Sequence, residues 1–394
     1  MKPSAAALAL ILCGCMGGGP LSAAAATTSP AAEGTATRPS ITAARGLPSQ
    51  VPQTLARAAV VGSQPLTGPN RIDFVGVHWR GAGVGGSVRF RHDDEWTAWQ
   101  PLHVGELHPP GRVASELLAA GHATAYQVRM RPGSSDVRAV AINTTDGPRQ
   151  TVWASPARAG DAVALGLSLP RSRSSRACYL SRALWGADES LRFDAQGTEV
   201  WPATFSPAQR LTIHHTVTDP GTEAGETDPA AIVRAIYRYH AVDLGWGDIG
   251  YQLLVGQQGC VYEGRYSGAD GLPVYDLPTS PGQPEAVTAG HTLRHNVGNI
   301  GIALLGNFND LEPSRAALRS LTATLAALST VSGLDPTGYG TYVNPINGAT
   351  KDSNVISGHR DYLVTECPGE NLYARLVELR EEASPRIHGA GLRR

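Results

Sequence analysis

The strongest constraint on the fold is an unbroken apolar segment in the second half of the chain. Residues 299–306 carry an apolar residue or glycine at every position after Asn299. A strand of this composition is typical of a sheet that is covered on both faces. Helical apolar patterns lie on both sides of the segment, at 229–240 and 313–331. Because strands and helices alternate, we predict an α/β fold for this half of the chain.

The neighbouring elements follow from their start signals and their apolar spacing. Asp228 and Pro229 form an N-cap followed by a proline at the first helical position. The helix that they open has Ile232, Ile236 and Tyr239 on one face, which we expect to lie against the core. The predicted helices cover 229–240, 313–331 and 371–383, and further strands are predicted at 211–214 and 249–255.

The first half of the chain has a different pattern. Apolar residues alternate with polar ones in short runs at 72–79, 87–91, 126–131 and 137–142, separated by Gly, Pro and Asp clusters. A period of two is typical of half-buried strands, and several such strands within roughly 90 residues indicate a small β-sandwich. Trp96 and Trp99 lie near a turn, where they either stack on sugar rings or cover the sandwich core.

At 394 residues, the chain is long enough for two or three domains. Residues 27–56 and 150–177 are rich in small and polar residues, and we interpret them as a disordered spacer and a linker. These segments delimit a β-sandwich domain of unknown role at 57–149 and an α/β domain at 178–385. Residues 386–394 remain as a tail.

The first 26 residues have the order of a secretory signal. Lys2 precedes an apolar stretch from Ala5 to Cys15, which small residues follow up to Ala26. The stretch is shorter than the roughly 20 residues of a membrane span, and we predict no transmembrane segment. Cleavage at the alanine run gives a secreted protein of the cell envelope, whereas a lipoprotein-type cleavage leaves Cys15 as a lipid anchor. The formal net charge of -1 gives no support for a nucleic-acid partner.

Three residues far apart in the chain offer metal ligands. His214 ends an apolar strand, and His359 and Cys367 lie near the C-terminus. Loss of the leader leaves an odd number of cysteines, so one thiol outside the cell has a role other than pairing. Two imidazoles and one thiolate suit Zn²⁺, and three protein ligands leave a position open for water, as in catalytic sites. For each histidine taken alone, an ordinary structural or surface role is the more common one.

Taken together, these segments resemble the peptidoglycan recognition protein family, in the same superfamily as type 2 N-acetylmuramoyl-L-alanine amidases. The resemblance covers roughly residues 178–383. It implies a central mixed β-sheet flanked by helices, and hydrolysis of the amide bond between N-acetylmuramic acid and L-alanine in bacterial peptidoglycan. The motifs that carry it are Trp185-Gly186-Ala187-Asp188, His214-His215-Thr216, residues 245–251, residues 259–265, residues 299–302 with 306–308, Gly358-His359-Arg360-Asp361 and Cys367-Pro368-Gly369.

The resemblance implies roles for individual residues. His214, His359 and Cys367 match the zinc ligands, which makes His215 a structural residue on the opposite face of its strand. Tyr251 matches the catalytic tyrosine, whose hydroxyl hydrogen-bonds the metal-bound water or the developing oxyanion. Family members that only bind peptidoglycan often lack the cysteine ligand. Its presence favours hydrolysis over the alternative, a non-catalytic peptidoglycan-binding envelope protein.

Thr365 stands two positions before the cysteine ligand, where phage relatives carry lysine and many recognition proteins carry threonine. Its hydroxyl either assists catalysis or stabilises the turn. His291 matches a family Gly-Ala-His segment and either lines the substrate groove or packs the loop. Arg294 and Asn296 are candidate contacts for the stem peptide. The sequence assigns no general base and no oligomeric state.

Two further features lie around the motif at 259–265. Glu263 and Arg265 predict a local ion pair or a turn feature. The family's glycine and aromatic residue after this arginine are replaced by Tyr266-Ser267, so the preference for diaminopimelate or lysine in the stem peptide stays open. Cys178 and Cys260 are the two thiols not used by the metal, and outside the cell they could form a disulfide.

Overall fold

The computed structural model describes residues 48–81, 85–108, 111–153, 178–218, 228–268, 272–276 and 284–390. These residues belong to one compact unit, Ala44–Arg394. The predicted signal peptide (1–26), the Cys15 anchor, the spacer up to residue 47 and the linker residues 154–177 lie outside the described residues. Within the described part of the chain, no helix is both long and apolar enough to cross a membrane.

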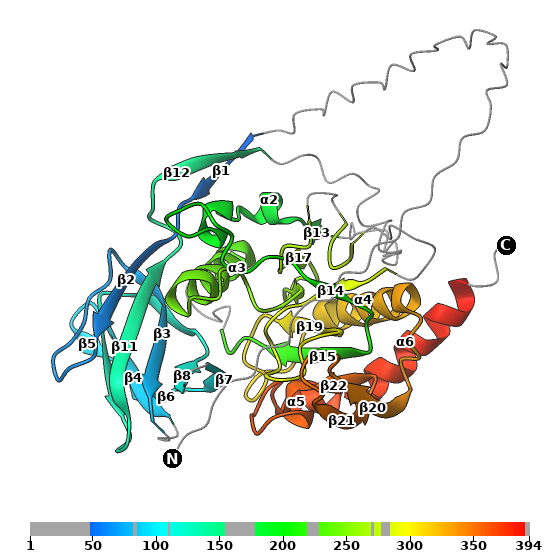
Figure 1. Ribbon diagram of the computed structural model, residues 1–394. Coiled ribbons are helices and arrows are strands. Elements are labelled where there is room, and N and C mark those ends of the chain that lie inside the picture. Colours follow the sequence, from blue (N-terminus) through cyan, green and yellow to red (C-terminus); the bar gives the residue numbers. More distant parts are fainter. Residues whose placement is uncertain are drawn as a thin grey trace, which may run out of the picture. The chain divides into compact units, whose positions relative to one another are not determined.

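Residues 48–153, the β-rich segment, form antiparallel sheets (Figure 1). One sheet has the order β10-β4-β5, with β6 also on β4, and the other has the order β2-β11-β3-β8-β7, with β9 also on β3; β1 pairs with β12. The strands are β1 (Pro48–Pro52), β2 (Leu55–Val60), β3 (Ile72–Arg80), β4 (Gly86–His92), β5 (Glu95–Trp96), β6 (Gln100–Pro101), β7 (Val104–His108), β8 (Arg112–Ser115), β9 (Leu118–Ala123), β10 (Ala125–Met130), β11 (Ser135–Asn143) and β12 (Arg149–Trp153).

The central strands β3 and β11 of the larger sheet are buried on both faces over most of their length. On β11, Ala139 and Ala141 belong to the core that this sheet shares with the smaller sheet. Val140 and Ile142, which alternate with them, belong to a second core together with Ile236 of the α/β part. The alternating pattern predicted strands exposed on one face, but here the second face packs against a helix that is distant in sequence.

One close contact fixes this packing. Gly76 on β3 lies against the Tyr239 ring, and a Cβ at this position would overlap the ring. The Tyr239 hydroxyl donates a hydrogen bond to the Ser115 carbonyl at 3.1 Å. Gly76 is therefore needed for close approach, because only glycine leaves room for an aromatic ring directly on the strand.

Strand pairing extends the β-rich segment beyond the predicted limits of 57–149. β1 and the start of β2 fall in the predicted 27–56 spacer, and β12 falls in the predicted 150–177 linker. β1 pairs with β12 along its whole length. Because the partners are far apart in sequence, local composition did not reveal them.

Trp96 and Trp99 do not cover the core of the β-rich segment. Both rings are half-buried, and the Arg89 guanidinium lies 4.7 Å from the centroid of the Trp96 ring and 4.8 Å from that of Trp99. The guanidinium therefore stacks between two aromatic faces, a favourable cation–π arrangement.

The α/β part contains a six-stranded sheet of order β13-β17-β16-β19-β15-β22. β19 is buried along its length and runs parallel to both neighbours, whereas β16 and β17 are antiparallel. The sheet is therefore mixed, as predicted. Its strands are β13 (Tyr179–Leu180), β15 (Arg210–His215), β16 (Leu253–Val255), β17 (Val261–Glu263), β19 (Asn299–Leu304) and β22 (Ile356–Gly358); β14 (Phe205–Ser206) pairs with β18 (Ala286–Val287), and β20 (Tyr339–Val343) with β21 (Thr350–Asn354).

Helices cover both faces of this sheet (Figure 1). Leu321 of α4 and Leu379 of α6 share a core with Ile302, while Ile232 of α3 shares the other core with Ala303. The helices are α2 (Arg182–Trp185), η1 (Glu189–Arg192), α3 (Pro229–Arg238), the π-helical turn η2 (Tyr239–Asp243), α4 (Arg315–Ser332), η3 (His359–Asp361), α5 (Glu370–Ala374) and α6 (Leu376–Ala390).

Several predicted boundaries shift. The Asp228 carboxylate caps α3 as predicted, but Ser314 rather than Pro313 precedes α4 and caps it. The predicted strand at 249–255 is paired only at 253–255, because the backbone N–H of Gly250 donates to His240 Nδ1 instead of to a strand. The last helix is divided into α5 and α6, and α6 continues to Ala390, into the predicted 386–394 tail.

Candidate metal centre

Two parallel strands bring the predicted ligands together. His214 lies near the end of β15, and His359 directly follows β22. β15 and β22 are paired in parallel, so their carboxyl ends lie at the same edge of the sheet. Cys367 returns to this edge because the Arg360 N–H donates to the Cys367 carbonyl at 2.9 Å. Residues 359–367 therefore form a loop that presents two donors side by side.

The donor atoms of His214, His359 and Cys367 all lie within 4.8 Å of one another, and all three residues are buried. Cys367 Sγ lies 3.6 Å from His214 Nδ1. Zinc bonds of about 2.3 Å to sulfur and about 2.0–2.1 Å to nitrogen at a tetrahedral angle place these two atoms about 3.6 Å apart. The donor set and the spacing therefore fit a tetrahedral zinc ion.

A chain of hydrogen bonds orients His214. His291 Nε2 lies 3.0 Å from the Asn299 carbonyl, so this nitrogen carries the proton and donates. His291 Nδ1 then accepts from His214 Nε2, also at 3.0 Å, and shares this acceptor with the Thr292 hydroxyl at 2.8 Å. His214 is thereby held in the tautomer whose Nδ1 lone pair faces Cys367. Outer partners of this kind orient metal-binding imidazoles.

His291 reaches this position because the adjacent strand lacks a side chain. A Cβ at Gly301 of β19 would overlap the His291 ring. The His291 side chain is 1% exposed. Its place behind His214 favours a positioning role over the predicted substrate contact.

The cysteine has its own supporting contact. The His215 N–H donates to Cys367 Sγ at 3.4 Å, and such a bond stabilises a thiolate. The His215 ring faces away from the ligands, where its Nδ1 accepts from the Phe308 N–H at 3.3 Å. Burial, first, and the neighbouring positive groups lower the pKa of His215 to about 3. His215 is therefore neutral, and its ring is bound to the backbone of the loop after β19.

Burial also keeps His214 neutral. Desolvation, followed by the charges of His359, His291 and His215, holds the pKa of His214 well below its ordinary value. A metal ion requires an unprotonated imidazole nitrogen. The environment of His214 therefore prepares it for metal binding.

The two predicted catalytic residues lie beside the ligands. The Tyr251 ring centroid is 5.2 Å from that of His214, and the side chain is 6% exposed. Thr365 lines a cavity together with Cys367, and its hydroxyl oxygen accepts from the Cys367 N–H at 3.2 Å. This second contact stabilises the turn and leaves the hydroxyl proton available for donation.

Asn296 and Arg294, the predicted contacts for the stem peptide, differ from each other in their surroundings. The Asn296 side-chain oxygen accepts from the N–H groups of His291 and Thr292, at 2.9 and 2.7 Å. It therefore holds the loop that carries His291. The Arg294 side chain is exposed, and its carbonyl accepts from Asn344 Nδ2 at 2.7 Å.

A buried charge cluster anchors the segment before Tyr251. The Asp248 carboxylate accepts from Arg182 at 2.9 Å and from Arg265 at 2.8 Å. Desolvation raises the pKa of Asp248, but the two guanidinium groups outweigh it and the net pKa is lowered. Arg265 thus pairs with Asp248 and not with Glu263, whose carboxylate accepts from the Arg182 N–H. Asp248 lies within the motif at 245–251, but the sequence gave no role to Asp248 and did not single out Arg182.

Comparisons with known proteins bear on the same region. Residues 204–370 match the family described as N-acetylmuramoyl-L-alanine amidase. Peptidoglycan-recognition protein SA of Drosophila melanogaster is 32% identical over 216 residues, which cover 55% of this chain and 85% of that protein. This chain belongs to the peptidoglycan recognition protein and type 2 amidase family. The matched range contains His214, Tyr251, His359, Thr365 and Cys367.

The share of the relative's length that is matched differs widely among further relatives. The N-acetylmuramoyl-L-alanine amidase of Homo sapiens is 33% identical over 170 residues, 42% of this chain but 23% of the human protein. The structure of wild-type Drosophila PGRP-LB has 25% identity and a TM-score of 0.35, over 51% of this chain and 93% of that one.

The predicted Cys178–Cys260 disulfide is confirmed in this chain, with a Cα–Cα distance of 4.5 Å.

Proposed function

We propose that the protein is a zinc-dependent N-acetylmuramoyl-L-alanine amidase that hydrolyses the amide bond between the lactyl group of muramic acid and L-alanine in bacterial peptidoglycan. The observation that carries this proposal is the convergence of two imidazoles and one thiol, with donor atoms within 4.8 Å of one another. Membership of the peptidoglycan recognition protein family supports the substrate.

His214, His359 and Cys367 would hold the ion, and His291 would keep Nδ1 of His214 directed at it. Zinc bound in this way lowers the pKa of a water ligand and polarises an amide carbonyl. The Tyr251 hydroxyl would donate a hydrogen bond to the carbonyl oxygen as negative charge develops on it. Thr365, beside Cys367, would offer a second donor to the same oxygen.

Mass spectrometry of digested sacculi, with and without a chelator, tests the proposal. We expect release of peptides that begin with L-alanine from glycan strands that keep the lactyl group, and loss of this release in the chelator. Binding to sacculi with no cleavage would indicate a non-catalytic peptidoglycan-binding envelope protein instead. Cleavage that the chelator leaves unchanged would refute the metal requirement.

We also propose that the protein is secreted to the cell envelope through the signal at 1–26. The Cys178–Cys260 disulfide supports an oxidising compartment. Cell fractionation with mass spectrometry of the mature N-terminus tests this. An N-terminus at Thr27 or nearby would support free secretion, an acylated Cys15 would support a lipid anchor, and an intact Met1 in the cytoplasm would contradict export.

We further propose two functional domains. One is the β-sandwich predicted at 57–149, which strand pairing extends to 48–153, and the other is the amidase predicted at 178–385, which α6 extends to Ala390. The antiparallel sheets and their common core support the first. The ligand set and the family match support the second.

A further inference from the structure

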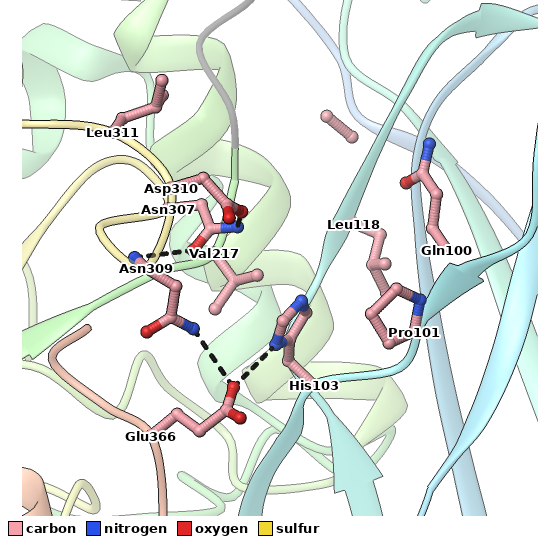
Figure 2. Close-up of a pocket in the computed structure, with 11 residues that line it drawn as sticks. Gln100, Pro101, His103, Leu118, Val217, Asn307, Asn309, Asp310, Leu311 and Glu366 are labelled. Carbon is pink, nitrogen blue, oxygen red and sulfur yellow. Dashed lines mark hydrogen bonds and ion pairs between the residues drawn. The ribbon is translucent and has the colours of Figure 1, made fainter. Parts of the chain in front are cut away.

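A cavity of about 590 Å³ lies between the β-rich segment and the α/β part. Figure 2 shows its two walls: Gln100 and His103 come from the β-rich segment, and Asn309, Asp310 and Glu366 come from loops of the α/β part. The volume is within the range of roughly 300–1,000 Å³ that is typical of ligand sites. Each wall carries side chains that form hydrogen bonds beside apolar ones such as Leu118 and Val217.

This cavity continues to the metal centre. A second cavity of about 490 Å³ shares His103, Val217 and Glu366 with the first, and Cys367 and Thr365 line it. The two cavities are therefore adjoining parts of one cleft, called here the interdomain cleft. One end of the interdomain cleft lies at a candidate zinc ligand.

A carboxylate bridges the two walls of the interdomain cleft. Glu366 Oε2 lies 3.4 Å from His103 Nδ1 and accepts from Asn309 Nδ2 at 3.1 Å (Figure 2). Glu366 directly precedes the candidate ligand Cys367. The β-rich segment is thus in polar contact with the loop that carries the metal ligand.

Peptidoglycan consists of glycan strands and stem peptides, and the residues that line the interdomain cleft favour one of these two parts as the ligand. Among the described residues, the larger cavity is lined by no lysine or arginine, but by Asp310, Glu366 and three side-chain amides. The smaller cavity adds one residue of each charge, Glu116 and Arg131. Stem peptides carry free carboxylates and are repelled by such a wall. The glycan is uncharged when its lactyl groups bear peptides, and its hydroxyl and acetamido groups pair with carboxylates and amides.

We propose that the interdomain cleft binds the glycan strand of peptidoglycan, so that the β-rich segment supplies one wall of the substrate site. This inference rests on the proposed amidase function. The glycan in the cleft brings a lactyl amide to the metal edge beside Cys367. Gln100 and His103, which lie outside the range matched by the amidase family, are specificity-determining residues for polymeric substrate.

The first measurement is binding of peptide-free N-acetylated glycan strands to the full-length protein by isothermal titration calorimetry. We expect the double variant Gln100→Ala/His103→Ala to bind about tenfold more weakly than the wild type, the effect of one or two lost hydrogen bonds. The control Gln53→Ala removes an exposed glutamine of the β-rich segment away from the cleft and should bind like the wild type. Gln100→Ala alone, on an exposed strand, keeps the test available if the double variant does not fold.

The second measurement compares substrates. For the double variant we expect KM to rise about tenfold on uncrosslinked polymeric peptidoglycan and to rise by much less on a muramoyl-peptide with a single sugar. Unchanged glycan binding and unchanged KM would overturn the inference while leaving the amidase proposal intact. Weaker binding of free stem peptide would assign the cleft to the peptide and also overturn it. Failure of the wild type to cleave either substrate would instead refute the amidase proposal.

Discussion

Two buried polar clusters lie close together in the α/β part. In each of them the loss of water around polar groups is compensated in a different way. The candidate metal centre buries His214, which is neutral and linked through His291 to a backbone carbonyl. The Asp248 cluster buries full charges and compensates them with Arg182 and Arg265. The first arrangement leaves donor atoms available for a ligand, whereas the second uses the whole carboxylate for the fold. We therefore expect substitutions in the first cluster to affect function and those in the second to affect stability.

The largest effect is expected for Cys367→Ala. Loss of the thiolate removes one of three ligands, so turnover of dye-labelled sacculi should fall at least about a thousandfold, equivalent to several kcal/mol of transition-state stabilisation. Zinc content by plasma mass spectrometry should fall in parallel, while the metal-free unfolding midpoint changes little. Wild-type activity in this variant would disprove the ligand assignment.

Asp248→Asn should separate the second cluster from the first. The substitution leaves two buried guanidinium groups without their shared counter-ion, which costs about 3–5 kcal/mol of unfolding free energy. Urea denaturation measures this loss. The matched control is Asp136→Asn, which removes an exposed carboxylate that also contacts arginines and should change stability little. Equal losses in the two variants would contradict the role of burial.

His291→Ala tests the hydrogen-bond chain behind His214. Without its acceptor, His214 is free to rotate or change tautomer, so zinc affinity should fall about 10–100-fold. A competition titration with a chromophoric chelator measures this. Gly301→Ala should have a similar effect because its Cβ displaces the His291 ring. Unchanged zinc affinity in both variants would leave His291 with only a loop-packing role.

The smallest effect is a pH dependence of the Asp248 cluster. Because the folded pKa of Asp248 is lowered below its unfolded value of 3.8, the stabilisation is complete above about pH 5. As pH falls below the unfolded pKa, the unfolded chain binds a proton that the folded chain does not, and stability falls by up to about 1.4 kcal/mol per pH unit until the folded pKa is reached. The difference between wild type and Asp248→Asn should therefore shrink between pH 5 and 3. A constant difference would show that Asp248 is not the titrating group.

The sequence predicted the parts of the molecule that local pattern and motif can encode. His214, His359 and Cys367 stand in recognisable motifs, and the apolar run at 299–306 predicted the central strand of the sheet. The position of His291 behind His214 was not predicted. It depends on Gly301, which is ten positions away and lies on β19, the strand beside β15. The Asp248 cluster was not predicted because it joins residues 182, 248 and 265, and no local spacing relates these positions.

The second covered face of the β-rich segment was hidden for a related reason. Val140 and Ile142 alternate with Ala139 and Ala141, as they would in a strand exposed on one side. The contact of Gly76 with Tyr239, and the core that Val140 and Ile142 share with Ile236, show that a helix occupies that side. The sequence therefore indicated strands in this segment, but not what they pack against.

The loop from His359 to Cys367 has a mechanical consequence. It places two of the three donors just after β22, which is the outermost strand of its sheet, while the third donor lies on β15. An ion held by all three residues would fasten the edge strand to its neighbour across the sheet. Edge strands separate most readily from an open sheet. Separation of β22 from β15 would then require the ion to leave first. Amide hydrogen exchange along residues 356–358 would report metal occupancy without any substrate present.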